Sequence, residues 1–185
     1  PLHNNLGTIL EELGKHQNAK SCYEKAIQIQ PNYLIALNNL GNLLKELGDY
    51  QKAKNCYEKA IQIQPSNVAS LNNLGNVLGK LEENKKSISY YDEVIKINPN
   101  YFLAHNNKGV ILQKLRKFDE SLKSYNNAFK INPNYNFLLG KVLYLKSCIC
   151  DWKYFDENLN TLKDKLSNNL ASSSPFSVTT LYDLP

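Results

Sequence analysis

Residues Ala19 to Pro31 read AKSCYEKAIQIQP, and residues Ala53 to Pro65 read AKNCYEKAIQIQP. The two stretches lie 34 residues apart and differ only where Asn55 stands in place of Ser21. Prolines recur at the same interval along the chain, at positions 31, 65, 99 and 133. A fixed period of roughly 20 to 50 residues indicates a protein built from stacked repeats. The sequence therefore predicts four repeat units, at about 1–33, 34–67, 68–101 and 102–135.

Each unit contains two runs of apolar residues with helical spacing. In the second unit the runs are Leu34, Leu37, Leu40, Leu44 and Leu47, then Ala53, Cys56, Tyr57, Ala60 and Ile61. Gly48 lies between them, and glycine ends a helix readily because it tolerates a left-handed backbone conformation. These features predict an all-α fold made of helical hairpins.

A pattern of small and large residues recurs in every hairpin. In order along the chain it reads Leu6, Gly7, Leu10, Ala19, Tyr23, Ala26, Pro31; Leu40, Gly41, Leu44, Ala53, Tyr57, Ala60, Pro65; Leu74, Gly75, Leu78, Ser87, Tyr91, Val94, Pro99; and Gly109, Leu112, Ser121, Tyr125, Ala128, Pro133. This pattern resembles the tetratricopeptide repeat, from which Ser87, Val94, Lys108 and Ser121 depart. The resemblance implies a right-handed superhelical solenoid with a concave side. Gly41 and Ala53 would let the paired helices approach, while Tyr57 fills the gap toward the next unit.

The first helix of each pair carries two adjacent asparagines, namely Asn4 and Asn5, Asn38 and Asn39, Asn72 and Asn73, and Asn106 and Asn107. The second asparagine of each pair is similar to the asparagine ladder in the repeat domain of O-linked N-acetylglucosamine transferases. That resemblance implies that Asn5, Asn39, Asn73 and Asn107 bind peptide in the concave groove. Asn42 and Asn76 extend the same stripe.

A primary amide offers both a hydrogen-bond donor and an acceptor, so it can bind a peptide backbone without reading side chains. Packed helices lie ~8–10 Å apart and an extended chain rises ~3.3 Å per residue. One asparagine could therefore serve about every third peptide residue, which predicts a sequence-tolerant groove for extended polypeptides. The alternative is that duplication copied an inert asparagine. Asparagine is a mediocre helix former, which favours the functional interpretation modestly.

Two other binding classes stay open at this point. Some tetratricopeptide domains hold the C-terminal carboxylate of a chaperone with lysine and arginine on their first helices. The corresponding positions here are Pro1, Ile35, Ala69 and Leu103, and Asn4, Asn38, Asn72 and Asn106, none of which is cationic. The sequence thus argues against such a clamp. The remaining alternative is an assembly scaffold that binds one defined protein partner and has no glycosylation role.

Composition narrows the function classes. The net charge is +5, but Arg116 is the only arginine among the 22 basic residues. Proteins that recognise the bases of nucleic acids commonly use arginine side chains. We therefore expect no nucleic-acid partner. No apolar run approaches the ~18 residues of a membrane span. The four cysteines fit a reducing compartment better than a disulfide framework, which predicts a cytoplasmic protein.

The sequence also offers no catalytic or metal-binding motif. It contains no Gly-rich phosphate loop, nucleophile elbow or His-Glu-x-x-His. The cysteines, His3, His16 and His105 follow no ligand spacing. His3 and His105 stand where other units have Leu37 and Leu71, so we expect them to pack against neighbouring side chains. We predict no catalytic residue, metal or cofactor in this chain.

The repeat pattern is lost after Pro133. Residues 137–149 predict an apolar helix and residues 151–166 an amphipathic one, a capping or linker pair at about 135–168. Residues 169–185 are too rich in serine for a helix and predict an irregular tail.

Two short motifs lie in this C-terminal region. Cys150 to Asp156 read CDWKYFD, and Ser174 to Ser177 read SPFS. They resemble the stretch that joins the repeats to the catalytic part of the same transferase family, the glycosyltransferase family 41 type with its SPINDLY-like members. That resemblance implies a longer parent protein that transfers N-acetylglucosamine from a uridine diphosphate donor to protein. Its catalytic domain would begin near or beyond Pro185.

Overall fold

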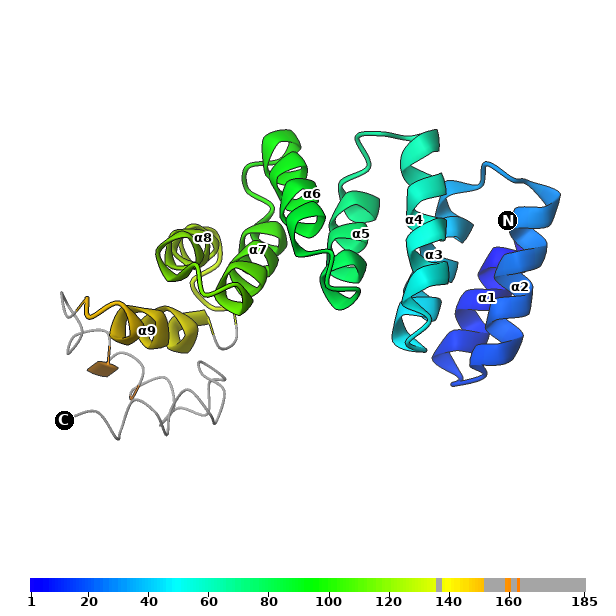
Figure 1. Ribbon diagram of the computed structural model, residues 1–185. Helices are drawn as coiled ribbons and strands as arrows, with labels where there is room; N and C mark the ends of the chain where they lie inside the picture. Colours follow the sequence, from blue (N-terminus) through cyan, green and yellow to red (C-terminus); the bar gives the residue numbers. More distant parts are fainter. Residues whose placement is uncertain (136–137, 152–158, 161–162, 164–185) are drawn as a thin grey trace. The chain divides into compact units, whose positions relative to one another are not determined.

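The computed structural model describes residues 1–135, 138–151, 159–160 and 163. In this part of the chain every regular element is an α-helix, and the helices follow one another as hairpins (Figure 1). They are α1 (Leu2–Glu12), α2 (His16–Ile29), α3 (Leu34–Glu46), α4 (Tyr50–Ile63), α5 (Val68–Lys80), α6 (Asn84–Ile97), α7 (Phe102–Lys114), α8 (Phe118–Ile131) and α9 (Leu138–Cys148). The predicted all-α fold of helical hairpins is confirmed. The chain forms two compact units, Pro1–Ile97 and Asn98–Pro185, divided at a boundary between repeats.

Two residues after the end of each first helix lies a residue with left-handed backbone. Two of these residues are Gly14 and Gly48, with φ of 71° and 80°, as expected for glycine after a helix. The equivalent positions one, two and three repeats later hold Glu82, Arg116 and Cys150, with φ of 63°, 58° and 56°. The turn therefore keeps its conformation without glycine, at a steric cost of about 1 to 2 kcal/mol per residue.

The left-handed Cys150 shows that the backbone period continues past Pro133, where the sequence pattern ends. α9 and Cys150 stand 34 residues after α7 and Arg116, so α9 takes the place of a first helix in a further repeat. The predicted apolar helix at 137–149 is observed as α9 (Leu138–Cys148). The second predicted helix and the tail lie outside the described residues.

The helices of each hairpin meet through a tyrosine ring that lies on a helical glycine. A Cβ atom added at Gly41 would stand 2.7 Å from Cε1 of Tyr57, and at Gly75 it would stand 2.7 Å from Cε1 of Tyr91. Gly7 and Gly109 face Tyr23 and Tyr125 in the same way, at 2.6 and 2.8 Å. These separations leave no room for any side chain larger than hydrogen.

Serine replaces the expected alanine opposite the glycine in two hairpins. Ser87 and Ser121 are fully buried, and each hydroxyl donates a 2.7 Å hydrogen bond, to the carbonyl oxygen of Gly75 and of Gly109 respectively. A buried hydroxyl without a partner would destabilise the fold. These bonds explain why the two departures from the repeat pattern are tolerated.

Each unit has its own apolar core, formed where a second helix packs on the next first helix. In Pro1–Ile97 a cluster of buried residues includes Leu43, Tyr57, Leu74 and Val77 from α3, α4 and α5. In the second unit Leu122, Tyr125 and Ala128 of α8 pack against Leu138, Val142 and Leu145 of α9. A hairpin could not bury these residues without the next helix packed against it, as expected for a repeat architecture.

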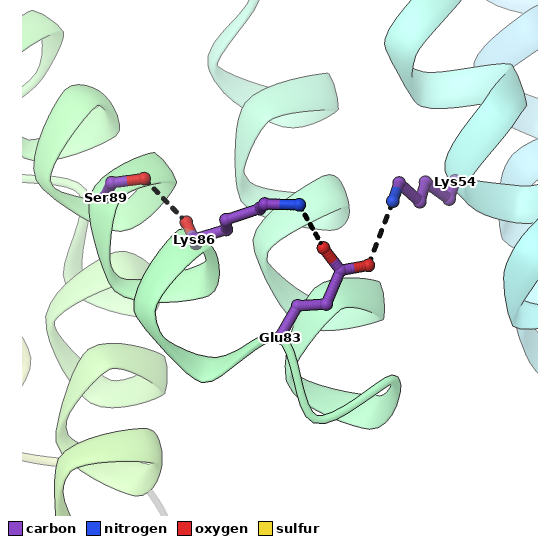
Figure 2. Close-up of polar contacts among 4 residues, drawn as sticks. All are labelled: Lys54, Glu83, Lys86 and Ser89. Atoms are coloured by element: carbon purple, nitrogen blue, oxygen red, sulfur yellow. Dashed lines mark hydrogen bonds and ion pairs between the residues drawn. The ribbon is translucent and has the colours of Figure 1, made fainter.

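An ion-pair cluster joins the second and third hairpins of the first unit (Figure 2). Glu83, in the turn between α5 and α6, contacts Lys54 of α4 at 2.9 Å and Lys86 of α6 at 2.5 Å. The hydrogen bonds from Lys86 and then Lys54 lower the pKa of the Glu83 carboxyl. Lys54 is the least exposed member of the cluster, with 17% of its side chain exposed. This contact therefore adds ion pairs to a junction that also contains apolar packing.

We predict that Gly41→Ala destabilises the protein by about 1 to 2 kcal/mol. The added methyl group overpacks against Tyr57, which costs ~1–3 kcal/mol, and the higher helix propensity of alanine offsets only ~0.5–1 kcal/mol. Urea unfolding measures the effect. In a Tyr57→Leu background, where the ring is gone, the cost of Gly41→Ala should fall sharply. Equal costs in both backgrounds would show that the ring contact is not the cause.

We further predict that Arg116→Gly stabilises the protein by about 0.5 to 1 kcal/mol, because glycine adopts a left-handed backbone without steric cost. The matched change in the opposite direction, Gly48→Ala, should destabilise it by a similar amount. Nothing lies within 4 Å of a Cβ atom added at Gly48, so its effect would be conformational alone. The midpoint of urea unfolding measures both variants. A destabilising Arg116→Gly would contradict the prediction.

Candidate peptide-binding face

The four asparagines predicted to form a ladder lie at one register of the first helices. Asn5, Asn39 and Asn73 come from α1, α3 and α5 of the first unit, and Asn107 comes from α7 of the second unit. Asn5 is exposed and the other three are half-buried. All four side chains therefore lie at or near the surface, at equivalent positions of their repeats.

The first asparagine of each pair has a different environment. Asn4, Asn72 and Asn106 are only 4–5% exposed, although each is the neighbour in sequence of a ladder asparagine. The Oδ1 atom of Asn4 accepts a 3.1 Å hydrogen bond from Nδ2 of Asn39 in the next repeat. Oδ1 of Asn38 likewise accepts a 2.8 Å bond from the hydroxyl of Ser70. This column links consecutive first helices and is structural.

The two asparagines that extend the predicted stripe are engaged by buried tyrosines. The hydroxyls of Tyr57 and Tyr91 donate 2.7 Å hydrogen bonds to Oδ1 of Asn42 and of Asn76. Oδ1 of Asn42 also accepts a 3.0 Å bond from Nδ2 of Asn73 in the next repeat. The carbonyl oxygen of Asn42 thus has two donors, and what Asn42 can offer a ligand is its amide N–H groups.

The tyrosine hydroxyls remain donors near neutral pH. Burial raises the pKa of Tyr91 to about 12 and also raises the pKa of Tyr57. Where the first helix lacks asparagine at the Asn42 position, another acceptor is used: Tyr23 bonds Glu11 at 2.6 Å and Tyr125 bonds Gln113 at 3.1 Å. The buried phenol requires an acceptor, and in two of the repeats that acceptor is asparagine.

The side-chain amides of Asn39 and Asn73 keep hydrogen-bonding groups that could serve a ligand. Asn39 and Asn73 each use one N–H on an asparagine of the preceding repeat. Each keeps a second N–H and the carbonyl oxygen Oδ1, which are the groups that pair with a peptide C=O and N–H. Asn107 accepts a 3.1 Å bond from Asn106 within its own helix. The arrangement fixes the orientation of the amides of Asn39 and Asn73.

The structure adds one residue that sequence reasoning missed. Lys141 of α9 lies 34 residues after Asn107, and its Nζ donates a 3.2 Å hydrogen bond to Oδ1 of Asn106. The ammonium also stands 5.2 Å from the centre of the Tyr125 ring. The repeat interval could have identified this residue, because Lys141 stands 34 residues after Asn107. The residue type changes at this position, from asparagine to lysine.

Other candidate residues belong to the packing of the protein. His105 is 8% exposed, as its place in a leucine position predicted, and its Nε2 lies 2.9 Å from the carbonyl oxygen of Pro99. Burial raises the pKa of the Cys56 thiol to about 11, so this cysteine is a poor nucleophile. Cys56 lines a hollow of about 300 Å³ between α2, α3 and α4, together with Leu37 and Leu40.

Within the described ranges, no three histidine, cysteine, aspartate or glutamate side chains come together as a potential metal site. The helices found in those ranges are also too short or too polar to cross a membrane.

Comparison with solved structures supports the fold. Similar chains include MamA from Desulfovibrio magneticus RS-1, at 18% identity and a TM-score of 0.81, with 90% of this chain and 94% of that chain covered. YrrB is similar at 21% identity and a TM-score of 0.75, covering 98% and 91%. Pseudomonas aeruginosa pilF is similar at 18% identity and a TM-score of 0.76, covering 86% and 72%. At these identities the likeness concerns the fold.

A search of curated protein sequences finds no match. Family profiles do match. A profile described as Tetratricopeptide repeat covers residues 1–66, and a second profile with the same description matches residues 68–101 and 102–135. Proteins of this kind generally bind protein or peptide partners through their repeats. The chain belongs to the tetratricopeptide repeat family.

Proposed function

We propose that the first helices of this protein bind extended polypeptide segments through the peptide backbone. The observation that supports this most directly is the tethering of Asn39 and Asn73. Each amide is held by one hydrogen bond to the preceding repeat and keeps an acceptor and a donor at the surface. In the first unit the proposed ligand face consists of α1, α3 and α5, and the equivalent first helices of the second unit are α7 and α9.

Tethering matters because binding normally costs conformational entropy for every side chain that it immobilises, about 0.5 to 1.5 kcal/mol each. An asparagine already fixed by its neighbour avoids part of that cost. Asn42 adds donors to the same face, since its carbonyl oxygen is saturated by Tyr57 and Asn73. The face would therefore present fixed donors and acceptors to a peptide, without pockets that select its side chains. YrrB, of similar fold, is described as having an unusual peptide-binding site, in keeping with this proposal.

The alternative is that the asparagine ladder binds no peptide. In that case the amide bonds between repeats would serve stability alone, and the protein would be a scaffold for one defined partner that recognises other surfaces. The two proposals differ in what they predict for short peptides. Backbone recognition predicts binding of many unrelated sequences, whereas a scaffold predicts binding of one partner.

The test selects 12-residue peptides from a random display library and measures their affinity by calorimetry. We predict that replacing Asn39, Asn73 and Asn107 together by alanine weakens binding at least tenfold, because each lost hydrogen bond is worth about 0.5 to 1.5 kcal/mol. Asn18→Ala, at an exposed site on α2, is the control and should leave affinity unchanged.

Two peptide variants separate backbone from side-chain recognition. Scrambling the order of the residues should change affinity little, while N-methylation of alternate peptide amides should abolish binding. Unchanged affinity of the triple variant for a peptide that the wild type binds would return these asparagines to a structural role.

We also propose that the repeats present protein substrates to a glycosyltransferase domain in a longer parent chain. The sequence CDWKYFD at Cys150 to Asp156 and SPFS at Ser174 to Ser177 support this proposal by resemblance. Of these residues, the structure describes Cys150 and Asp151. The acceptor protein would lie along the first-helix face, and the donor UDP-N-acetylglucosamine would bind in the catalytic domain.

We predict that these 185 residues alone transfer no sugar, because glycosyl transfer needs a donor pocket and a positioned acid or base. A parent chain with the catalytic domain should label a protein extract from radiolabelled donor. Label incorporated by the 185-residue chain would refute the first expectation. A parent that neither labels protein nor hydrolyses donor would refute the second and favour a scaffold.

A further inference from the structure

The hollow lined by Cys56 lies within the first unit, between the second helices α2 and α4 and beside α3. Part of its wall is apolar: Ile27 is half-buried, and Leu37, Leu40 and Cys56 are buried. Its volume of about 300 Å³ is larger than the ~150 Å³ that accommodates benzene in an apolar protein cavity. An aromatic ring therefore fits the hollow.

The next junction of the same unit, between α4 and α6, shows which side chain fills this position. The repeat interval carries Leu40 to Leu74 and Cys56 to Tyr90. Tyr90 packs against the cluster of buried residues that contains Leu74. Burial raises the pKa of Tyr90, as expected for a ring that is partly removed from water. The hollow between α2 and α4 therefore occurs where a cysteine stands in place of a tyrosine.

The rim of the hollow carries charges that complement a phenol. Glu24 of α2 and Lys59 of α4 both line it and are exposed. The carboxylate of Glu24 can accept a hydrogen bond from a phenol hydroxyl, and the ammonium of Lys59 can approach the face of the ring. Beside Tyr90 the equivalent positions hold Glu58 and Glu93, so the first acid is common to both junctions and the cation is particular to the hollow.

A second hollow continues from the first along the same two helices. It measures about 580 Å³ and shares Ile27 and Lys59 with the first hollow. Its lining also includes the side-chain amides of Asn32 and Gln62, which can bond the N–H and C=O of a peptide. A ring-sized hollow beside a polar one suits an aromatic side chain attached to a polypeptide better than a free aromatic molecule.

We propose that the hollow between α2 and α4 binds a tyrosine side chain of a partner polypeptide, in the position that Tyr90 occupies from within at the next junction. The site lies on second helices, and none of the ladder asparagines is among the described residues that line it. It is therefore separate from the peptide-binding function proposed for the first helices. The protein would hold two polypeptide segments at once, one on each set of helices.

The experiment uses the full chain and two kinds of probe. p-Cresol reproduces the tyrosine side chain, and a capped Gly-Gly-Tyr-Gly-Gly peptide is compared with its alanine version. We expect p-cresol to bind with a Kd of about 1 mM and to shift the methyl NMR signals of Ile27, Leu37 and Leu40. The tyrosine peptide should bind about tenfold more tightly than the alanine peptide, because only the former buries a ring.

Three variants test the position of the ring. Cys56→Tyr should fill the hollow from within and abolish the binding of both probes. Cys22→Tyr makes the same change one repeat earlier, at a position that does not line the hollow, and should bind as wild type. Tyr90→Cys should open an equivalent hollow at the next junction, so that p-cresol also shifts the signals of Leu71 and Leu74.

Unshifted signals of Ile27, Leu37 and Leu40 at the highest soluble concentration of p-cresol would overturn the site, as would wild-type affinity in Cys56→Tyr. Equal affinity for the tyrosine and alanine peptides would overturn a polypeptide as the occupant. A Tyr90→Cys protein that gains no second site would contradict the equivalence of the two junctions, on which the inference rests. The NMR map of wild type needs no substitution, so it decides the question even where a variant fails to fold.

Discussion

The contact between a tyrosine ring and a helical glycine governs the geometry of every hairpin. The rings of Tyr57 and Tyr125 are completely buried, and a Cβ atom at the facing glycine would stand within 2.8 Å of the ring. Two helices can approach this closely only where one of them has no side chain. The contact therefore sets how far apart the helices of a pair lie. It also sets where the phenol oxygen emerges, because the ring reaches across the hairpin toward the first helix.

The same contact connects the core to the proposed ligand face. The hydroxyl of Tyr57 ends on Oδ1 of Asn42, which also accepts from Asn73 of the next repeat. A buried phenol requires a hydrogen-bond partner, and that requirement places a polar residue on the first helix in every repeat. Asn42 and Asn76 meet it as amides, whereas Glu11 and Gln113 meet it elsewhere. Packing and the proposed peptide recognition would thus use one set of side chains, so a change in the core would disturb the orientation of the ladder amides.

Departures from the repeat pattern are tolerated where a local interaction compensates for them. Ser121 takes an alanine position because its hydroxyl donates to the Gly109 carbonyl. Arg116 takes a glycine position in the left-handed turn, and the hairpin packing around it holds that conformation. Lys141 takes a ladder position because the Tyr125 ring and Asn106 accommodate its ammonium. The fold depends on the shape and polarity needed at each position more than on residue identity.

Sequence alone determined the period, the helical hairpins and the register of the ladder, because all three are set by spacing along a regular helix. It expected Tyr57 to fill the gap toward the next unit, whereas only the structure showed that the ring lies on Gly41 of its own hairpin. It could not tell which amide groups of Asn38 and Asn39 are used between repeats, since adjacent asparagines look alike until the neighbouring repeats supply their partners. It predicted a helix at 137–149 but not that this helix, α9, takes the place of a further first helix, because the residue pattern ended while the backbone turn at Cys150 persisted. Hydrogen-bond partners 31 to 35 residues away decided which amide groups are used inside the protein. Such partners depend on the packing of one repeat against the next, and for that reason only the tertiary structure revealed them.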